Sequence, residues 1–266
     1  MENYIVSARK YRPTTFESVV GQRALTTTLK NAIATGKLAH AYLFCGPRGV
    51  GKTTCARIFA KTINCMTPTA DGEACNQCES CTAFNEQRSY NIHELDAASN
   101  NSVDDIRQLV EQVRIPPQIG KYKVYIIDEV HMLSAGAFNA LLKTMEEPPP
   151  HVKFILATTE IHKVPATIVS RCQHFDFHRI RNEDIVSRLM YIASQEGFTL
   201  HEDAAGMIAR LSDGGMRDAL SLLDQCVAYE NDITLDVVSS ASGIAGRDYL
   251  FDILEKIAEK DAAGAL

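Results

Sequence analysis

The sequence has no tryptophan, few aromatic residues and no long apolar run. Its 266 residues include 9 tyrosines and 10 phenylalanines, so no platform of aromatic rings for stacking nucleic-acid bases is evident. The absence of an apolar stretch of roughly 18 residues argues against a membrane-spanning helix. The first residues, Met1 to Tyr4, lack the apolar core of a secretory signal. We therefore expect a cytoplasmic protein with no membrane partner.

An excess of basic residues is missing as well. Lysine and arginine number 27 against 33 acidic residues, which gives a net charge of -6 and a pI near 5.8. Such a chain does not bind DNA over its whole surface. A local candidate is the helix start after Asn101, where Ser102 and Asp105 fit a capping box. Its backbone N–H groups would hold a DNA phosphate without a basic side chain; the alternative is a simple capped turn.

The hydrophobic pattern predicts an α/β domain followed by a helical one. We expect strands at 41–45, 91–96, 123–128 and 153–158. Helical patterns lie between them, at 52–64, 103–113 and 135–146. This alternation is typical of a parallel sheet with helices on both faces. Beyond about residue 178 only helices are predicted, at 182–196, 202–211, 216–229, 234–242 and 247–260.

A glycine-rich loop lies directly between the first strand and the first helix and fits the pattern GxxxxGKT. Glycines let successive N–H groups point inward at phosphates, and the following helix adds its positive N-terminal dipole. Lys52 is expected to bridge the β- and γ-phosphates of ATP, and Thr53 to bind Mg²⁺. The predicted ATP/ADP-binding residues of the loop are Gly46, Pro47, Arg48, Gly49, Val50, Gly51, Lys52, Thr53 and Thr54.

Two carboxylates follow the apolar run that ends at Ile127, about 75 residues after the loop. Asp128 is expected to hold Mg²⁺ through water, and Glu129 to orient and polarise an attacking water. An acidic strand end without function is the alternative. His131 follows closely and is interpreted as an ordinary packing residue.

Four of the eight cysteines form a cluster with the spacing C-x9-C-x2-C-x2-C. Four thiolates suit a tetrahedral Zn²⁺ and leave no open position, so the site is expected to be structural. Four free thiols in an irregular loop are the alternative. The predicted zinc ligands are Cys65, Cys75, Cys78 and Cys81.

Several further segments, in their order and spacing, resemble the AAA+ clamp-loader ATPases. The resemblance assigns an adenine-binding segment to Tyr11, Arg12, Pro13, Val19 and Val20. It makes Thr158 of Ala157-Thr158-Thr159-Glu160 the γ-phosphate sensor. In Ser170-Arg171-Cys172 it implies that Arg171 is a finger reaching a neighbouring subunit, and it implies that Arg217 is a second sensor, carried by the lid.

The cysteine cluster together with the intact Lys52 and Thr53 is similar to the gamma/tau subunits of bacterial DNA polymerase III. Delta-prime subunits carry the cluster but typically have a degenerate loop. The resemblance implies an AAA+ domain at 1–178 with a zinc module at about 64–83, a helical lid at 179–242, and the truncated start of a third domain at 243–266.

The same resemblance implies an ATP-driven motor that loads a ring-shaped sliding clamp onto primer–template DNA, within a hetero-pentamer of clamp-loader subunits. Two alternatives remain open at this point. One is a non-hydrolysing, delta-prime-like scaffold, and the other is a different AAA+ DNA motor.

Overall fold

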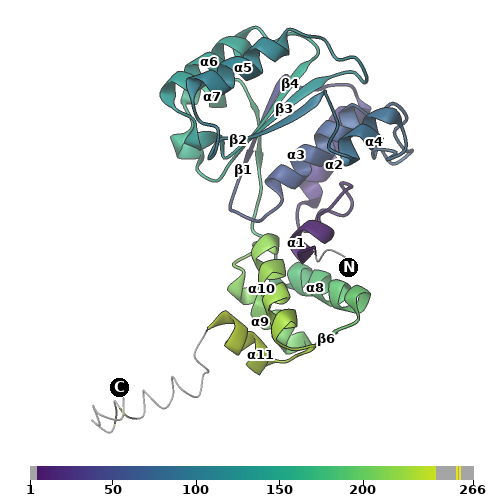
Figure 1. Ribbon diagram of the computed structural model, residues 1–266, viewed down its shortest axis with the longest axis vertical. Helices are drawn as coiled ribbons and strands as arrows, with labels where there is room; N and C mark the ends of the chain where they lie inside the picture. Colours follow the sequence, from purple (N-terminus) through teal and green to yellow (C-terminus); the bar gives the residue numbers. More distant parts are fainter. Residues whose placement is uncertain (1–4, 244–255, 257, 259–266) are drawn as a thin grey trace. The chain divides into compact units, whose positions relative to one another are not determined.

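The computed structural model describes residues 5–243, 256 and 258 (Figure 1). The chain divides into two compact units. One is Pro13–Arg179, and the other combines the described parts of Met1–Arg12 and Ile180–Leu266. The amphipathic helix predicted at 247–260 lies outside the described residues, apart from 256 and 258.

The unit Pro13–Arg179 is built on a five-stranded sheet with the order β2-β3-β4-β1-β5. Every neighbouring pair of strands is parallel. The strands are β1 (Ala41–Cys45), β2 (Ile92–Asp96), β3 (Lys123–Asp128), β4 (Val152–Thr158) and β5 (Gln173–Asp176). The first four confirm the sequence predictions to within one residue. β5 was not predicted, because it is an edge strand that buries only Phe175.

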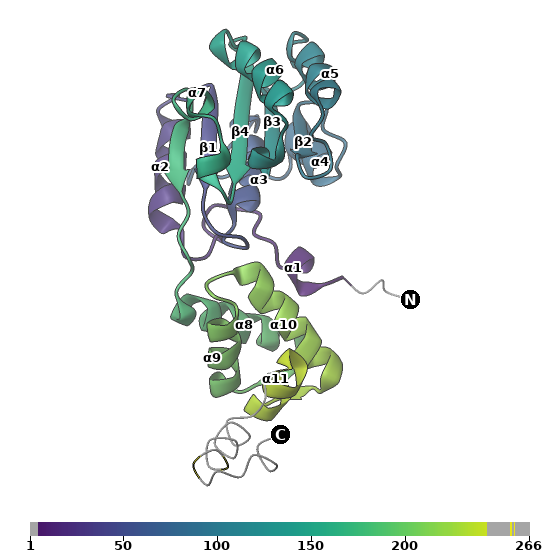
Figure 2. The ribbon, with the colours of Figure 1, turned by 90° about the vertical axis from the view of Figure 1, so that its left-hand side faces the viewer.

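Helices cover both faces of this sheet (Figures 1 and 2). One face carries α2 (Arg23–Ala34), α3 (Lys52–Ile63) and α4 (Glu79–Asn85), and the other carries α5 (Val103–Val113), α6 (Ala135–Glu146) and α7 (Ala166–Val169). Short 3₁₀ turns occur at Val130–Met132 and Ile161–Lys163. Along β1, Tyr42 and Phe44 pack into the first layer while Leu43 and Cys45 pack into the second. The predicted fold class is confirmed.

The second unit is helical. Its helices are α1 (Ser7–Lys10), α8 (Asn182–Glu196), α9 (Glu202–Leu211), α10 (Met216–Tyr229) and α11 (Leu235–Ser242). The four longer ones confirm the predicted helices, and α8 ends at Gly197 with a left-handed φ of 77°. A two-residue parallel pair, β6 (Thr199–Leu200) with β7 (Asp232–Ile233), was not predicted. No helix among the described residues is long and apolar enough to cross a membrane.

The α1 segment belongs to the helical unit because of contacts distant in sequence. The Ser7 N–H donates to the Asp224 carboxylate of α10 at 2.8 Å. The side chain of Arg188 in α8 donates to the carbonyl oxygen of Tyr11 at 3.2 Å. Lys10 forms an ion pair with Glu196 at 2.6 Å. Residues at the start of the chain are thus attached by polar contacts to a unit made mainly by its last third.

Gly46 occupies a position where only a glycine fits. It follows β1 with φ of 145°, and a Cβ placed on it would lie 2.3 Å from the carbonyl oxygen of Phe177. That neighbour is itself fixed, because its N–H donates to the Cys45 carbonyl at 2.7 Å. Backbone therefore faces backbone, and neither side can rotate away.

Gly46→Ala is expected to lower the free energy of unfolding by about 3 kcal/mol or more, the upper end of overpacking costs. Gly36→Ala is the matched control, since Gly36 also has a positive φ, of 66°, but has open space around it; its cost should be about 1–2 kcal/mol. Urea unfolding of both variants measures the difference. Equal losses of unfolding free energy in the two variants would show that the contact with Phe177 adds no destabilisation.

Candidate functional site

The carboxyl ends of three adjacent strands bring the predicted site together. In the sheet, β4 lies between β3 and β1, so the loop after β1, the acidic end of β3 and Thr158 of β4 share one edge. The register pairs Cys45 with Thr158. One residue later, the Gly46 N–H donates to the Thr158 carbonyl at 3.2 Å.

The glycine-rich loop has the backbone shape that an anion-binding loop needs. Gly46, Gly49 and Gly51 all have positive φ values, and α3 begins at Lys52 without a side-chain cap. Its first N–H groups are therefore left for an anion. The Lys52 ammonium group lies within the loop, where it donates to the carbonyls of Gly46 at 2.8 Å and Pro47 at 2.6 Å.

Opposing effects act on the pKa of Lys52. Its side chain is buried, and this burial lowers the pKa of Lys52, whereas the nearby carboxylates of Glu129 and Asp128 raise it. The two acidic residues thus compensate electrostatically for the removal of an ammonium group from water. The loop and the acidic strand end form one electrostatic unit.

Thr53 and Asp128 meet directly. The Thr53 hydroxyl donates to the Asp128 carboxylate at 2.6 Å, although 75 residues separate them. The other oxygen of Asp128 accepts from the Glu129 N–H at 2.9 Å. A hydroxyl and a carboxylate are the hard oxygen ligands that Mg²⁺ prefers, so the donor set fits this ion.

Glu129 is held in an unusual conformation beside this pair. Its φ is 46°, in the left-handed region that residues other than glycine seldom adopt. The Thr159 hydroxyl donates to Oε2 of its carboxylate at 3.1 Å, and Nδ1 of His131 lies 3.5 Å from the same oxygen. Among the described residues, both contacts fall on Oε2, which leaves Oε1 for a water molecule.

His131 links the acidic strand end to β4, so the interpretation of it as an ordinary packing residue is wrong. The ring is 6% exposed; its Nε2 lies 3.3 Å from Oε1 of Glu160 and its Nδ1 lies 3.0 Å from the Thr158 hydroxyl. Lys163 and, to a lesser extent, His131 lower the pKa of Glu160. The His131 ring thus lies between the Glu160 carboxylate and the Thr158 hydroxyl.

The two threonines of β4 and the loop after it have different surroundings. Thr158 is fully buried, and its hydroxyl accepts from the Glu160 N–H at 3.0 Å while also contacting His131. Thr159 is half-buried and its hydroxyl reaches Glu129. The sensor role predicted for Thr158 stays a prediction, but Thr159 is the threonine that faces the Glu129 carboxylate, and sequence reasoning passed over it.

Arg171 follows α7, and the contacts of its side chain are with residues outside the phosphate loop of the same chain. Its guanidinium donates to the Thr167 carbonyl at 2.7 Å and pairs with Glu146, the last residue of α6, at 2.9 Å. The side chain is 34% exposed. The next residue, Cys172, packs against the core and anchors the segment.

The residues predicted to bind adenine fall in both units. Pro13, Val19 and Val20 belong to the sheet unit, whereas Tyr11 and Arg12 belong to the helical unit. The Tyr11 hydroxyl donates to Glu196, and burial followed by this contact raises the pKa of Tyr11 to about 12. Arg217 is exposed at the start of α10 in the helical unit.

The four clustered cysteines converge. Their sulfur atoms all lie within 4.8 Å of one another, with 4.0 Å from Cys65 to Cys78 and from Cys75 to Cys81. Four sulfurs about 2.3 Å from a tetrahedral zinc ion lie about 3.8 Å apart. The spacing of the four sulfurs is therefore close to that of a tetrahedral zinc site.

Hydrogen bonds prepare one of these thiols for ionisation. A bond from Thr67, followed by those from the N–H groups of Gln77 and Cys78, lowers the pKa of Cys75 to about 5. Burial instead raises the pKa of Cys81. A metal ion bound to the cluster would have to displace the proton of Cys81. Metal binding of this kind is coupled to proton release and to folding.

The predicted capping box at the start of α5 is confirmed. The Ser102 hydroxyl accepts from the Asp105 N–H at 3.2 Å, and the Asp105 carboxylate accepts from the Ser102 N–H at 3.1 Å. The box itself satisfies the Asp105 donor.

Comparisons with known proteins agree with this geometry. Residues 21–181 match the family model described as DNA polymerase III, delta subunit. Residues 184–232 match the model of the DNA polymerase III clamp loader subunit, ATPase lid domain. A solved structure of the Thermotoga maritima RuvB Holliday junction branch migration motor has a TM-score of 0.62 at 22% identity, covering 94% of this chain and 80% of that one. At that identity it shows the fold alone.

Relatives that match nearly the whole of this chain are more specific. The chain is 49% identical over 265 residues to DNA polymerase III subunit tau of Bacillus subtilis, covering 99% of this chain and 47% of the relative. Subunit tau of Escherichia coli is 44% identical, with 97% and 40% covered. Subunit gamma of Buchnera aphidicola (strain Bp) is 40% identical, with 97% and 70% covered. The chain thus spans about half the length of its Bacillus relative.

Two adjoining family models and relatives that match nearly the whole of this chain agree on one assignment. The chain belongs to the gamma/tau family of DNA polymerase III clamp-loader ATPase subunits.

Proposed function

We propose that the chain is the ATP-hydrolysing motor of a bacterial sliding-clamp loader. The observation that carries this proposal is the convergence of Lys52, the Thr53–Asp128 pair and Glu129 at one sheet edge. A non-hydrolysing scaffold has no need for a carboxylate held beside an intact phosphate loop. Family membership points to loading of the clamp as the work that hydrolysis drives.

Each residue has a distinct part in the proposed reaction. The loop N–H groups and Lys52 bind the phosphates, with the ammonium exchanging its carbonyl partners for phosphate oxygens. Thr53 and Asp128 would hold Mg²⁺, which neutralises phosphate charge when bound. Glu129 orients water through Oε1 while Thr159 holds Oε2. The γ-phosphate contact predicted for Thr158 stays with that residue, because the one proton of the Thr159 hydroxyl is already donated to Glu129.

The first test separates binding from hydrolysis. Lys52→Ala should weaken ATP binding about 10- to 100-fold, since a hydrogen bond to a charged group contributes about 1.5–3 kcal/mol. Glu129→Gln should bind ATP normally but turn over about 100-fold more slowly or worse, because it can no longer accept a proton. Equilibrium binding and phosphate release measure the two effects. Wild-type turnover in Glu129→Gln would refute the catalytic role.

The cysteine cluster is proposed to hold one structural Zn²⁺. The sulfur spacing and the hydrogen bonds that lower the pKa of Cys75 support this. The loop around the cluster has a small core of its own, made by the cysteines and Ala74. It has too little apolar surface to order itself without the metal.

Elemental analysis should find one zinc per chain, and Cys78→Ser should lower that content together with thermal stability. Cys226→Ser is a suitable control, because Cys226 is buried in the helical unit and should leave zinc content unchanged. Purified, reduced protein that holds no zinc would contradict the assignment.

Arg171 is proposed to act on the nucleotide of a neighbouring subunit. Its guanidinium is partly exposed and is positioned by Thr167 and Glu146. In well-studied phosphoryl-transfer enzymes such a finger contributes roughly 10³–10⁵ in rate. Arg217 is proposed as the second phosphate-sensing arginine, carried by the lid.

A mixing experiment tests the finger. Arg171→Ala should abolish the rise in turnover that accompanies assembly while leaving ATP affinity nearly unchanged. Mixing it with Lys52→Ala chains should restore part of the activity, because one supplies the phosphate loop and the other supplies the arginine. Activity that never exceeds the sum of the two separate variants would exclude a finger acting between subunits.

The proposed partners are other clamp-loader subunits in a hetero-pentamer, the sliding clamp and primer–template DNA. With a net charge of -6, DNA contact is assigned to a local feature, the start of α5 after Asn101 and Ser102. Backbone N–H groups there that the capping box does not use are the groups proposed to meet DNA phosphates.

A further inference from the structure

Glu73 is a buried carboxylate that the nucleotide reaction and the metal cluster leave without a role. It lies two residues before Cys75 and is 8% exposed. Its own loop fixes its backbone, because the Thr69 N–H donates to the Glu73 carbonyl at 2.9 Å and the Glu73 N–H donates to the Thr69 hydroxyl at 3.1 Å. A buried carboxylate is costly unless its oxygens are satisfied.

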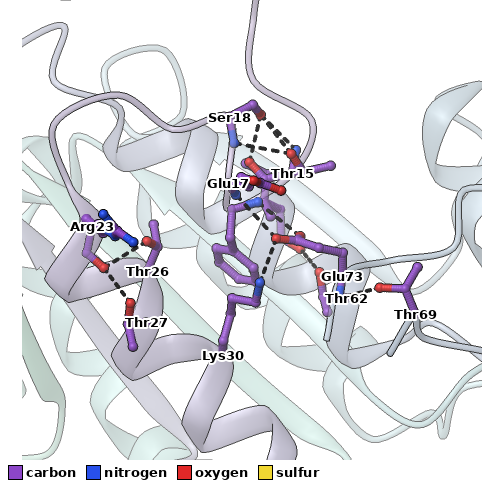
Figure 3. Close-up of polar contacts among 12 residues, drawn as sticks. Thr15, Glu17, Ser18, Arg23, Thr26, Thr27, Lys30, Thr62, Thr69 and Glu73 are labelled. Atoms are coloured by element: carbon purple, nitrogen blue, oxygen red, sulfur yellow. Dashed lines mark hydrogen bonds and ion pairs between the residues drawn. The ribbon is translucent and has the colours of Figure 1, made fainter. Parts of the chain in front are cut away.

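Both oxygens of Glu73 reach across to the segment before α2 (Figure 3). Oε2 accepts from the Phe16 N–H at 3.0 Å, and Oε1 accepts from the Glu17 N–H at 3.2 Å. Lys30 of α2 donates to Oε1 at 3.2 Å and supplies the balancing charge. The cysteine loop thus holds two backbone donors of a segment that has no regular secondary structure.

That segment also lies beside the phosphate loop. Thr15 and Ser18 close a tight turn through bonds between their hydroxyls and backbone (Figure 3). After the turn, Val19 packs in the same core cluster as Val50 of the phosphate loop. Its Cγ1 lies 4.0 Å from the position that a Cβ would take on Gly51.

The cysteine loop is also tied to the helix that follows the phosphate loop. The buried Lys61 of α3 donates to the Asn76 side chain at 2.7 Å, and Cys65 comes soon after α3 ends. The loop therefore holds the phosphate-binding helix at one side and, through Glu73, the Phe16–Val19 segment at the other.

We propose that Glu73 is a positioning residue that couples metal occupancy of the cysteine cluster to nucleotide affinity, and this rests on the proposed nucleotide site. With the cluster ordered, Glu73 fixes the Phe16 and Glu17 N–H groups and so holds Val19 against the phosphate loop. Without the metal, the loop loses its order and the carboxylate no longer holds the segment. Linkage requires the reverse effect as well, so bound nucleotide should slow metal loss.

The test is a cycle of two changes, zinc removal and Glu73→Gln, read by equilibrium binding of a fluorescent ADP analogue to the full chain. In the wild type, zinc removal should weaken ADP binding about 5-fold or more, the lower range of site-to-site coupling. Glu73→Gln with zinc bound should show a similar loss. Zinc removal from that variant should then weaken its ADP binding by less than about a further 2-fold. Glu79→Gln is the matched control, an exposed glutamate at the start of α4, and should behave as wild type.

Two results of this cycle would overturn the proposal. One is unchanged ADP affinity when wild-type protein loses zinc, and the other is an equal loss on zinc removal with and without Glu73. If Glu73→Gln does not fold, chelator-driven zinc release from the wild type is timed with and without ADP. Slower release with ADP is then expected, and equal release rates would overturn the coupling. Lys52→Ala distinguishes a failure of the coupling from a failure of the proposed nucleotide site. If this variant binds ADP as the wild type does, the nucleotide site itself is misassigned.

Discussion

Parallel hydrogen bonding of β3, β4 and β1 determines which chain segments can meet at the site. Parallel strands point their carboxyl ends in one direction, so three segments separated by long stretches of sequence leave the sheet side by side. Thr53 and Asp128 touch for this reason. The sheet is buried on both faces by helices, which makes the register hard to shift. Chemistry at this edge therefore depends on packing well away from it.

Around that edge, polar contacts form a continuous chain from β3 to β4. Glu129 is linked to Thr159, and His131 lies between Glu129, Thr158 and Glu160. A displacement of the loop after β4 would therefore reach the Glu129 carboxylate. On the opposite layer, Glu73 makes a comparable link between the cysteine loop and the segment over the phosphate loop. The first link joins side chains to one another, whereas Glu73 joins a side chain to backbone N–H groups.

Sequence patterns predicted the parts of the fold that depend on local chemistry. Buried strands such as β3 are indicated by apolar runs, and the capping box of Ser102 is a purely local arrangement. The edge strand β5 was not predicted because only its Phe175 is buried. The place of α1 in the helical unit was not predicted either, because it depends on a contact between residues 217 positions apart. The end of β4 directs the Thr159 hydroxyl toward Glu129 and the Thr158 hydroxyl toward His131. The spacing of residues in the sequence cannot reveal this difference.

For the role proposed for Arg171 between subunits, its pairing with Glu146 has a thermodynamic consequence. An arginine that already holds a carboxylate meets a phosphate by exchanging one anion for another. The net number of ion pairs then changes little at this contact, so its contribution to association should vary only weakly with ionic strength. The released Glu146 carboxylate, 47% exposed, returns to water at little cost. Selectivity for the neighbouring nucleotide would then come from geometry and from the higher charge of phosphate.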